Sequence, residues 1–274
     1  MTTSVNLALN NEANLAKDGH ETLKEACTFM ARFASTIIAA GSASARCEKT
    51  VNRIAEAYNV DVEMTILPRT VMMTVWDKEH LHSYHTSSRL PGIGLNFYLI
   101  TKLSTLSQDI LDEHQDFATA WKNFNEALNK PRLNPWVVTM LTGAANASFC
   151  RLFEGDWLAM LIVFIATVEG FWLKATLHSK WKWDIRLATL VAACNSSIIA
   201  CSGFLFGLTD TPDIALGTSV LYLVPGIPYI NSVSDLIHGH LLCCISRFIH
   251  ASMLTACLGI GLSLGILIMH ISYF

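Results

Sequence analysis

Residues 221–235 read LYLVPGIPYINSVSD, an apolar run interrupted near its centre by Pro-Gly-Ile-Pro. Pro225 and Pro228 each lack an N–H and clash with the preceding helical turn, while Gly226 lets the backbone bend. The sequence therefore predicts a helix that breaks at residues 225–228. At membrane depth such breaks occur where the freed backbone is buried in protein or lines a cavity, and in transporters they often form the substrate or ion site.

The residues around the break have the chemistry of an anion site. Pro228 suits the first position of a second half-helix, whose free N–H groups and positive dipole end could receive a carboxylate. Asn231 and Asp235 follow, one turn apart on one helix face. We assign substrate binding to Pro225, Gly226, Pro228, Asn231 and Asp235, and coupling to Asp235. Two alternatives stay open: a kink that only shapes packing, and Asp235 as a cap near the cytoplasmic surface.

Composition divides the 274 residues into two parts. The chain is 52% hydrophobic and 15% charged with a mean hydropathy of +0.39, and most charges precede residue 135. We predict a cytosolic α+β domain over residues 1–134 and a transmembrane helical domain over residues 135–274. The net charge of −3, with no basic stripe and no Gly-rich phosphate loop, argues against a nucleic-acid partner. No cofactor or metal is expected.

The first part is typical of helices that cover one face of a small sheet. Apolar residues at helical spacing predict helices over residues 21–40, 45–58, 95–111 and 115–128. Short runs bounded by turn residues predict antiparallel strands over residues 61–66, 70–76 and 80–87. Gly41 is a natural stop for the first helix.

The third predicted strand carries the pattern HxHxxH, formed by His80, His82 and His85. On a strand His80 and His82 would share one face at a separation that could bind a metal. No cysteine or acidic ligand accompanies them at a recognised spacing. A solvated strand with outward polar residues therefore explains the pattern better than a metal site.

Past Pro135 the chain consists of five apolar runs, each long enough to cross about 30 Å of hydrocarbon. They cover residues 136–153, 157–177, 185–208, 214–237 and 241–271. The basic residues near one set of ends are Lys122, Lys130, Arg132, Lys174, Lys180, Lys182, Arg186 and Arg247, against Arg151 alone at the other. The positive-inside rule then predicts a multi-pass protein of the plasma (inner) membrane with a cytoplasmic N-terminus and an external C-terminus. No cleavable signal peptide is expected.

Polar residues inside these runs are candidates for an ion or substrate pathway. Glu169 is a coupling candidate, although it lies near a helix end where it could reach the interface or pair with Lys174. Asn195, which begins the stretch Asn-Ser-Ser, joins the predicted substrate-binding residues. Buried acids and amides are costly in lipid, so their presence favours a role inside the bundle.

Three stretches together resemble the threonine/serine exporter family. LVPGIPYINSVSDLIHGH (223–240) resembles the signature segment of that family, GSASARCEKTVNRIAEAYNV (41–60) its early helical motif, and PRLNPWVVTMLTGAANASFCRLFEGDWLAM (131–160) its first hairpin. The likeness covers most of residues 39–240. Within the family it is greatest to the larger subunit of a two-component succinate exporter. The family motif falls on Pro225, Gly226, Pro228, Asn231 and Asp235.

The resemblance implies a function in transport rather than an enzyme. It implies a subunit of a secondary exporter of small carboxylate metabolites, succinate or threonine and serine, working with a separate small membrane subunit in the lipid bilayer. A homo-oligomer is left open. The alternatives are a scaffold or ligand-sensing membrane subunit, and a membrane-anchored enzyme. The enzyme would need a catalytic set in residues 1–134, where only the histidine cluster is available.

Overall fold

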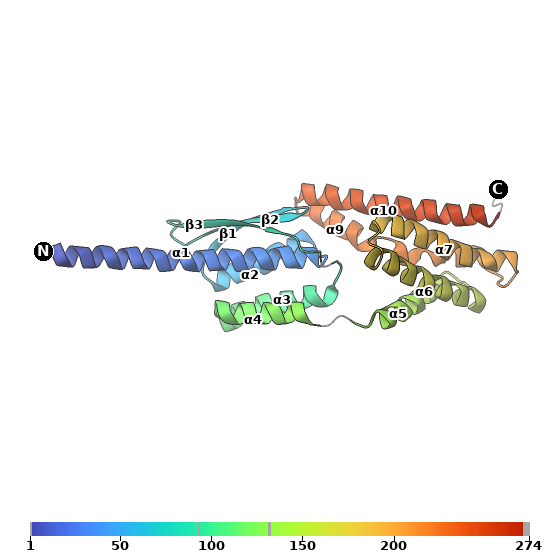
Figure 1. Ribbon diagram of the computed structural model, residues 1–274, viewed down its shortest axis with the longest axis horizontal. Coiled ribbons are helices and arrows are strands. Elements are labelled where there is room, and N and C mark those ends of the chain that lie inside the picture. The colour runs from blue at the N-terminus through green and yellow to red at the C-terminus, as the bar shows by residue number, and fades with distance from the viewer. Residues whose placement is uncertain (1, 93, 131–132, 271–274) are drawn as a thin grey trace. The chain divides into compact units, whose positions relative to one another are not determined.

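The computed structural model divides the chain into two compact units, and each is described by itself (Figure 1). The structure describes residues 2–92, 94–130 and 133–270, with side chains from residue 21 onward. The first unit joins Met1–Lys130 with Ile227–Phe248, and the second joins Pro131–Gly226 with Ile249–Phe274. A segment that the sequence assigned to the membrane part thus packs with the N-terminal residues.

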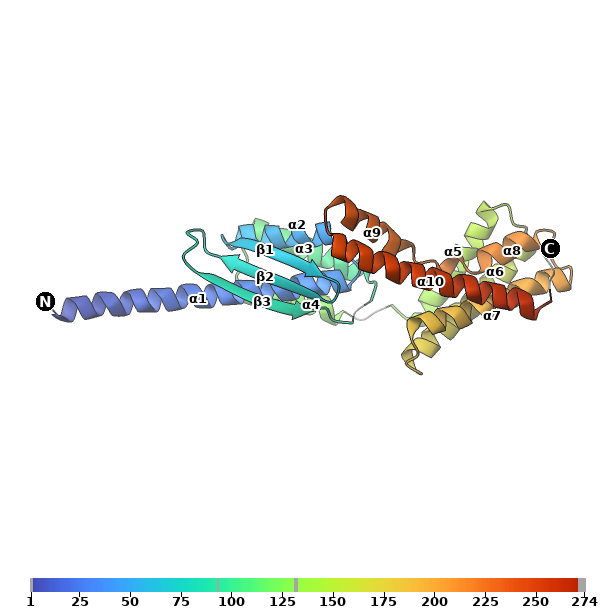
Figure 2. The same ribbon diagram turned by 90° about the horizontal axis from the view of Figure 1, so that it is seen from above.

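The first unit has three layers. Its N-terminal elements are α1 (Thr2–Ala39), α2 (Ser44–Ala57), β1 (Asp61–Leu67), β2 (Thr70–Trp76), β3 (Ser83–Arg89), α3 (Phe97–Glu113) and α4 (Phe117–Asn129). The strands form an antiparallel sheet in the order β1-β2-β3 (Figure 2). Strands β2 and β3 pack on α1 and β1 packs on α2, while α3 packs on α2 from the side away from the sheet (Figure 1).

The predicted elements agree with these bounds to within two residues, apart from two ends. Helix α1 begins at Thr2 rather than at residue 21, and the third strand begins at Ser83 rather than at residue 80. Along β2, Val71, Met73 and Val75 are buried against the helices while Met72 is exposed. This alternation is the pattern of a sheet with one covered face.

The prediction that His80 and His82 share a strand face is wrong, because both lie in the turn before β3. The Asp77 carboxylate accepts from the N–H groups of Leu81 at 2.8 Å and His82 at 3.2 Å, which holds the chain in a turn. His80 Nε2 lies 3.2 Å from Asp61 Oδ2, and His82 Nδ1 lies 3.1 Å from Asp77 Oδ2. The residues that the structure describes contain no group of three or more potential metal ligands.

One aromatic cluster forms the centre of the first unit. Phe29, Phe33 and Phe124 are fully buried, and the ring of Trp121 meets Phe29 edge-on with centroids 5.0 Å apart. Edge-on contacts of this kind add to the burial of apolar area. Cys27 lies between this cluster and the sheet, and its burial raises the pKa of the thiol to about 11. The helices and the sheet therefore share one core.

The second unit is a helical bundle. It contains α5 (Pro135–Leu152), α6 (Trp157–Ser179), α7 (Ile185–Leu205), α8 (Pro212–Ser219), the 3-10 turn η1 (Leu221–Leu223) and the part of α10 (Leu241–Ile268) that follows Phe248. Among the described helices α6, α7 and α10 are long and apolar enough to cross a membrane. The pair formed by Pro212–Leu223 and α9 (Gly226–Ile237) passes the same test as one broken span. Helix α5 does not, so a count of five spans stays a prediction.

Small residues allow the helices of the second unit to approach closely. A Cβ at Gly143 would meet Val168 and Phe164 across the α5–α6 contact. A Cβ at Gly261 would collide with the backbone oxygen of Leu190, which places α10 directly on α7. Close backbone approach through small residues is a common way to pack helices in lipid, where no hydrophobic effect drives their association.

Candidate functional site

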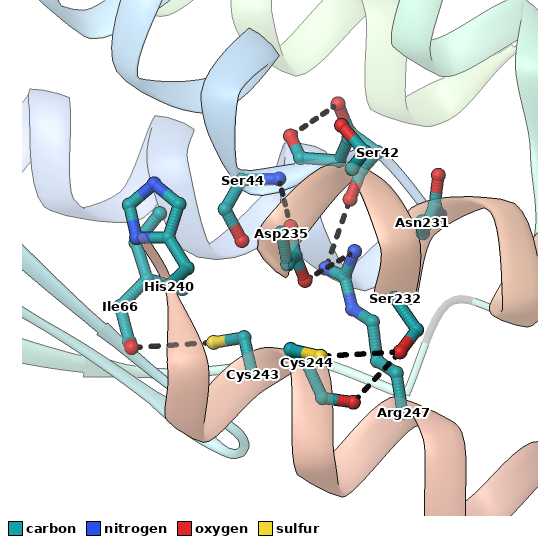
Figure 3. A network of polar contacts seen from close by, with 12 residues as sticks. Ser42, Ser44, Ile66, Asn231, Ser232, Asp235, His240, Cys243, Cys244 and Arg247 are labelled. Atoms are coloured by element: carbon teal, nitrogen blue, oxygen red, sulfur yellow. Dashed lines mark hydrogen bonds and ion pairs between the residues drawn. The ribbon is translucent and has the colours of Figure 1, made fainter. Parts of the chain in front are cut away.

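A helical hairpin brings the polar residues of the motif together. Helix α9 ends at Ile237, and Gly239 adopts a φ of 82°, a conformation that side-chain-bearing residues rarely tolerate. The N–H of His240 donates to Asp235 O at 2.8 Å, which closes a Schellman-type helix end. The chain then enters α10 at Leu241, so Asp235 on α9 faces Arg247 on α10 (Figure 3).

Asp235 is completely buried and forms an ion pair with Arg247 (Figure 3). Its Oδ2 lies 3.1 Å from Arg247 Nη1, and Arg247 Nη2 donates to the carbonyl oxygen of Ser42 at 3.0 Å. The arginine side chain is 20% exposed. A buried carboxylate is costly unless it is paired and hydrogen-bonded, and this one is both.

Asp235 also caps α2 from another part of the chain. Ala43 occupies the N-cap position of α2 and has no side chain that can accept a hydrogen bond. Asp235 Oδ1 accepts instead from the N–H of Ser44, the first residue of the helix, at 3.1 Å. A carboxylate at this place satisfies a free N–H group and interacts favourably with the helix dipole. Asp235 therefore has a capping contact within the first unit, while its roles in binding and coupling, and a place near the cytoplasmic surface, stay predictions.

Asn231 contacts the α1–α2 connection near the end of α1. Helix α1 ends at Ala39, Gly41 follows with a φ of 96°, and the N–H of Ser42 donates to Ile37 O at 3.2 Å. The carbonyl oxygen of Gly41 accepts from Asn231 Nδ2 at 2.8 Å. Asn231 and Asp235, one turn apart on α9, thus contact the end of α1 and the start of α2.

One further contact joins the two helices of the hairpin, and two fasten the hairpin to the N-terminal part of the first unit. Ser232 Oγ donates to Cys244 O at 2.9 Å, which joins α9 to α10. Cys243 Sγ lies 3.3 Å from Ile66 O in β1, and His240 Nε2 lies 3.3 Å from Glu48 Oε1 in α2. The neighbouring Cys47 is fully buried, and this burial raises the pKa of its thiol.

Arg247 lines a pocket of about 310 Å³ inside the first unit. Its walls come from the end of α1, the β1–β2 turn, the segment after β3 and the first turns of α10, namely Ile38, Ala39, Leu67, Pro68, Leu90, Pro91, Cys243, Ser246 and Arg247. Guanidinium has five N–H donors, so the contacts to Asp235 and Ser42 leave donors for a further acceptor. A pocket with apolar walls and one cation suits a small molecule with an apolar body and a carboxylate.

The second unit holds a separate polar cluster among its apolar helices. Asn146 Nδ2 of α5 donates to Thr167 Oγ1 at 2.6 Å and to Thr218 O at 3.0 Å. Ser196 Oγ lies 3.0 Å from the hydroxyl of Tyr222, and a Cβ at Gly170 would collide with both. These contacts link α5, α6, α7 and α8 with η1.

The break lies between Leu223 and Gly226, where Val224 and Pro225 are not helical. Helix α9 begins at Gly226, so Pro228 is its third residue and not its first as predicted. The first turn of a helix has no N–H groups bonded within the helix, so a proline is tolerated there as well. A Cβ at Gly226 would meet no described atom within 4 Å.

Two other predicted site residues lie apart from these networks. Asn195 is on α7 beside Ser196, and its buried Nδ2 has no hydrogen-bond partner among the described residues. Glu169 is exposed on α6, and no ion pair joins it to Lys174 in the part of the chain that the structure describes. Their assignment to binding and coupling stays a prediction.

Sequence reasoning missed two features of the site. Arg247 was used only to orient the chain, although a cation twelve residues after Asp235 across a Gly-containing turn is the natural partner of a buried acid. Tyr222 gave no signal, because it is a single polar residue in an apolar run, whereas Ser196 lies in the polar stretch that begins at Asn195. Ala43 before α2 was the available sign that another residue must cap this helix.

Comparisons with known proteins place the chain among exporters. A family model described as "Putative threonine/serine exporter" matches residues 28–269. The "Probable succinate transporter subunit YjjP" of Escherichia coli (strain K12) is 30% identical over 239 residues, which cover 82% of this chain and 88% of that protein. The protein of the same name from Klebsiella aerogenes is 29% identical over 236 residues, covering 82% and 87%. A "Probable threonine/serine exporter" of Mycobacterium tuberculosis is 21% identical over 239 residues, covering 86% and 44%. No solved structure gives a significant match.

The Asp235–Arg247 pair should contribute strongly to stability. Asp235→Asn keeps an oxygen that can accept from the N–H of Ser44 but leaves the Arg247 charge unbalanced. We expect the free energy of unfolding to fall by about 3 kcal/mol, as for other broken buried pairs. Chemical denaturation of the purified full chain in detergent, followed by circular dichroism, measures it.

Asp184→Asn is the matched control. Asp184 is exposed, lies 3.8 Å from Arg186 Nε and caps α7 through an oxygen that asparagine retains. Exposed pairs contribute little, so we expect a loss below about 1 kcal/mol. Equal losses of unfolding free energy in Asp235→Asn and Asp184→Asn would show that the buried pair contributes no more to stability than an exposed pair.

Proposed function

The chain belongs to the threonine/serine exporter family, and from that premise we propose that it is one subunit of a secondary exporter of small carboxylate-bearing metabolites, succinate or threonine and serine. The family match carries this proposal, because it includes the broken helix and the Asp235–Arg247 network. Two relatives are named as transporter subunits, which supports a separate partner subunit. Family and apolar helices together make the chain a membrane protein.

We propose a multi-pass arrangement in the inner membrane with the first unit on the cytoplasmic side. The excess of Lys and Arg near that set of helix ends supports it. The first eight residues of helix α10 belong to the first unit. The remaining residues 249–268 span about 30 Å as a helix, which matches the hydrocarbon thickness.

We propose that Arg247 receives the substrate carboxylate. Asn231 already donates to Gly41 O, and the carboxylate of Asp235 would repel another carboxylate. Arg247 is the cation of the motif region, lines the 310 Å³ pocket and has N–H donors to spare. A substrate carboxylate there competes with Asp235, which links binding to the cap of α2.

The break itself is proposed as a second contact for the substrate. In the first turn of α9 the N–H of Gly226 donates to Val224 O at 2.9 Å and Pro228 has no N–H, so we assign the substrate contact to the N–H of Ile227. Such a helix start favours an anion. The open space at Gly226 supports this reading, because a ligand could approach the backbone there without a side chain in the way.

A ligand-sensing subunit is the second candidate. It is favoured by the position of the pocket, whose lining residues all belong to the first unit. In that case the ligand would bind at Arg247 without being transported. An enzyme has less support, because His80 and His82 each pair with an aspartate in an exposed turn.

Reconstitution tests the proposed function. Vesicles containing this chain and its partner subunit should take up succinate, threonine or serine when an ion gradient is imposed. Vesicles containing either subunit alone should remain at the level of empty vesicles. Robust transport by this chain alone would contradict the need for a partner, and no transport of any of the three by the pair would contradict the substrate class.

Gly226→Leu tests the substrate contact at the break. Because a side chain at residue 226 meets no described atom, the variant should fold normally while the substrate loses access to the backbone. We expect transport to fall at least about tenfold, the effect of about 1.4 kcal/mol. Gly217→Leu is the control, since this glycine on α8 is equally unobstructed. Equal transport by both variants and the parent would show that the break does not contact the substrate.

Arg247→Lys tests the carboxylate partner. Lysine keeps the charge opposite Asp235 but loses the forked donors that bind a second carboxylate. We expect the KM for the carboxylate substrate to rise about tenfold while the amount of folded protein stays the same. Arg186→Lys, at a partly exposed site that does not line the pocket, should leave KM unchanged. An unchanged KM in both variants would exclude Arg247 from substrate binding.

A further inference from the structure

The two ends of the second unit carry opposite charge. At one end the α5–α6 and α7–α8 connections meet, where Thr209 Oγ1 donates to Asp156 Oδ1 at 2.8 Å and the N–H of Asp210 donates to Asp156 Oδ2 at 2.9 Å. The N–H of Ala159, with these donors, lowers the pKa of Asp156 below its usual range. Glu154 and Asp213 add to this acidic end.

The opposite end is the α6–α7 connection, and it is basic. Between residues 174 and 186 the chain carries four Lys or Arg residues and one acid, Asp184. Lys180 and Lys182 are exposed. Two indole rings lie beside them, with Trp181 65% and Trp183 42% exposed and their centroids 6.2 Å apart.

This connection, residues 178–184, has a defined conformation and is called the Trp-Lys loop below. The N–H of Trp183 donates to Leu177 O at 3.1 Å, and His178 Nδ1 lies 3.0 Å from Trp183 O. Asp184 accepts from the N–H of Arg186 at the start of α7, so its charge is used locally. In the described part of the chain no acid lies within ion-pair distance of Lys180 or Lys182.

The helices on both sides decide what this loop meets. Helices α6 and α7 can each cross a membrane, so the loop between them lies at the boundary between hydrocarbon and water. Exposed Trp172 and Leu187 continue the apolar surface from the loop onto both helices. Tryptophan favours the headgroup level, and lysine at the same level meets the lipid phosphates.

We propose that the Trp-Lys loop binds the phosphate headgroups of anionic phospholipids. Lys180 and Lys182 supply the charge, and Trp181 and Trp183 insert beside the acyl chains. A soluble anion would not use the exposed indoles. The lipid is the occupant that fits the cations, the rings and the two membrane-length helices together.

The experiment uses the full chain in bilayers that contain brominated phosphatidylglycerol or brominated phosphatidylcholine. Bromine quenches nearby indoles, and the signal of Trp181 is the difference between the parent and Trp181→Phe. We expect stronger quenching of Trp181 by the anionic lipid. Lys180→Gln/Lys182→Gln should abolish this preference, with a loss in relative affinity of about fivefold per lysine at low salt.

Three controls make the result specific. Lys180→Arg/Lys182→Arg keeps the charge and should keep the preference, as should Lys102→Gln/Lys122→Gln on exposed positions of the first unit. High salt should reduce the preference. Equal quenching by both lipids in the parent, or a preference that survives Lys180→Gln/Lys182→Gln, overturns the proposal. Loss of the preference with inorganic phosphate at constant ionic strength would assign the site to a soluble anion instead.

Discussion

The buried Asp235–Arg247 pair is the interaction on which the first unit depends. A single carboxylate balances the guanidinium and caps α2, while the guanidinium holds the carbonyl oxygen of Ser42. Desolvating either charge alone would cost several kcal/mol, so the two helices of the hairpin and the α1–α2 connection can only be buried together. This constraint explains why Ile227–Phe248 packs with residues far away in the sequence.

Glycine at two helix ends makes this arrangement possible. Gly41 and Gly239 both have positive φ, and each lets the chain reverse directly after a helix. One reversal presents the N–H of Ser44, and the other presents Asp235 with Arg247. Because both turns are tight, the polar groups reach one another without long flexible loops, and the pair is held by backbone geometry.

The local secondary structure could be predicted from the sequence, but the contacts between residues far apart in the chain could not. A break follows from Pro and Gly, although it lies at Val224 and Pro225 and not over residues 225–228 as predicted. The helices and strands of the first part follow from their apolar periods, except for the first 19 residues of α1 and the turn that Asp77 forms before β3. The contact between Ser44 and Asp235 joins residues 191 positions apart. The helix and strand propensities of neighbouring residues do not predict such a contact. The one local sign is Ala43, which cannot cap α2 through its side chain and so requires a cap from elsewhere.

The same physics bears on the proposed transport of carboxylates at the candidate site. An arginine that is already paired with an internal carboxylate holds its guanidinium in the geometry that a ligand carboxylate needs. The internal acid also prevents an unpaired buried cation when no ligand is present. A ligand carboxylate on the guanidinium would leave the buried Asp235 carboxylate without its counter-charge, so binding carries an energetic cost. A cost of this kind opposes tight retention, which helps a transporter to release its substrate after binding it.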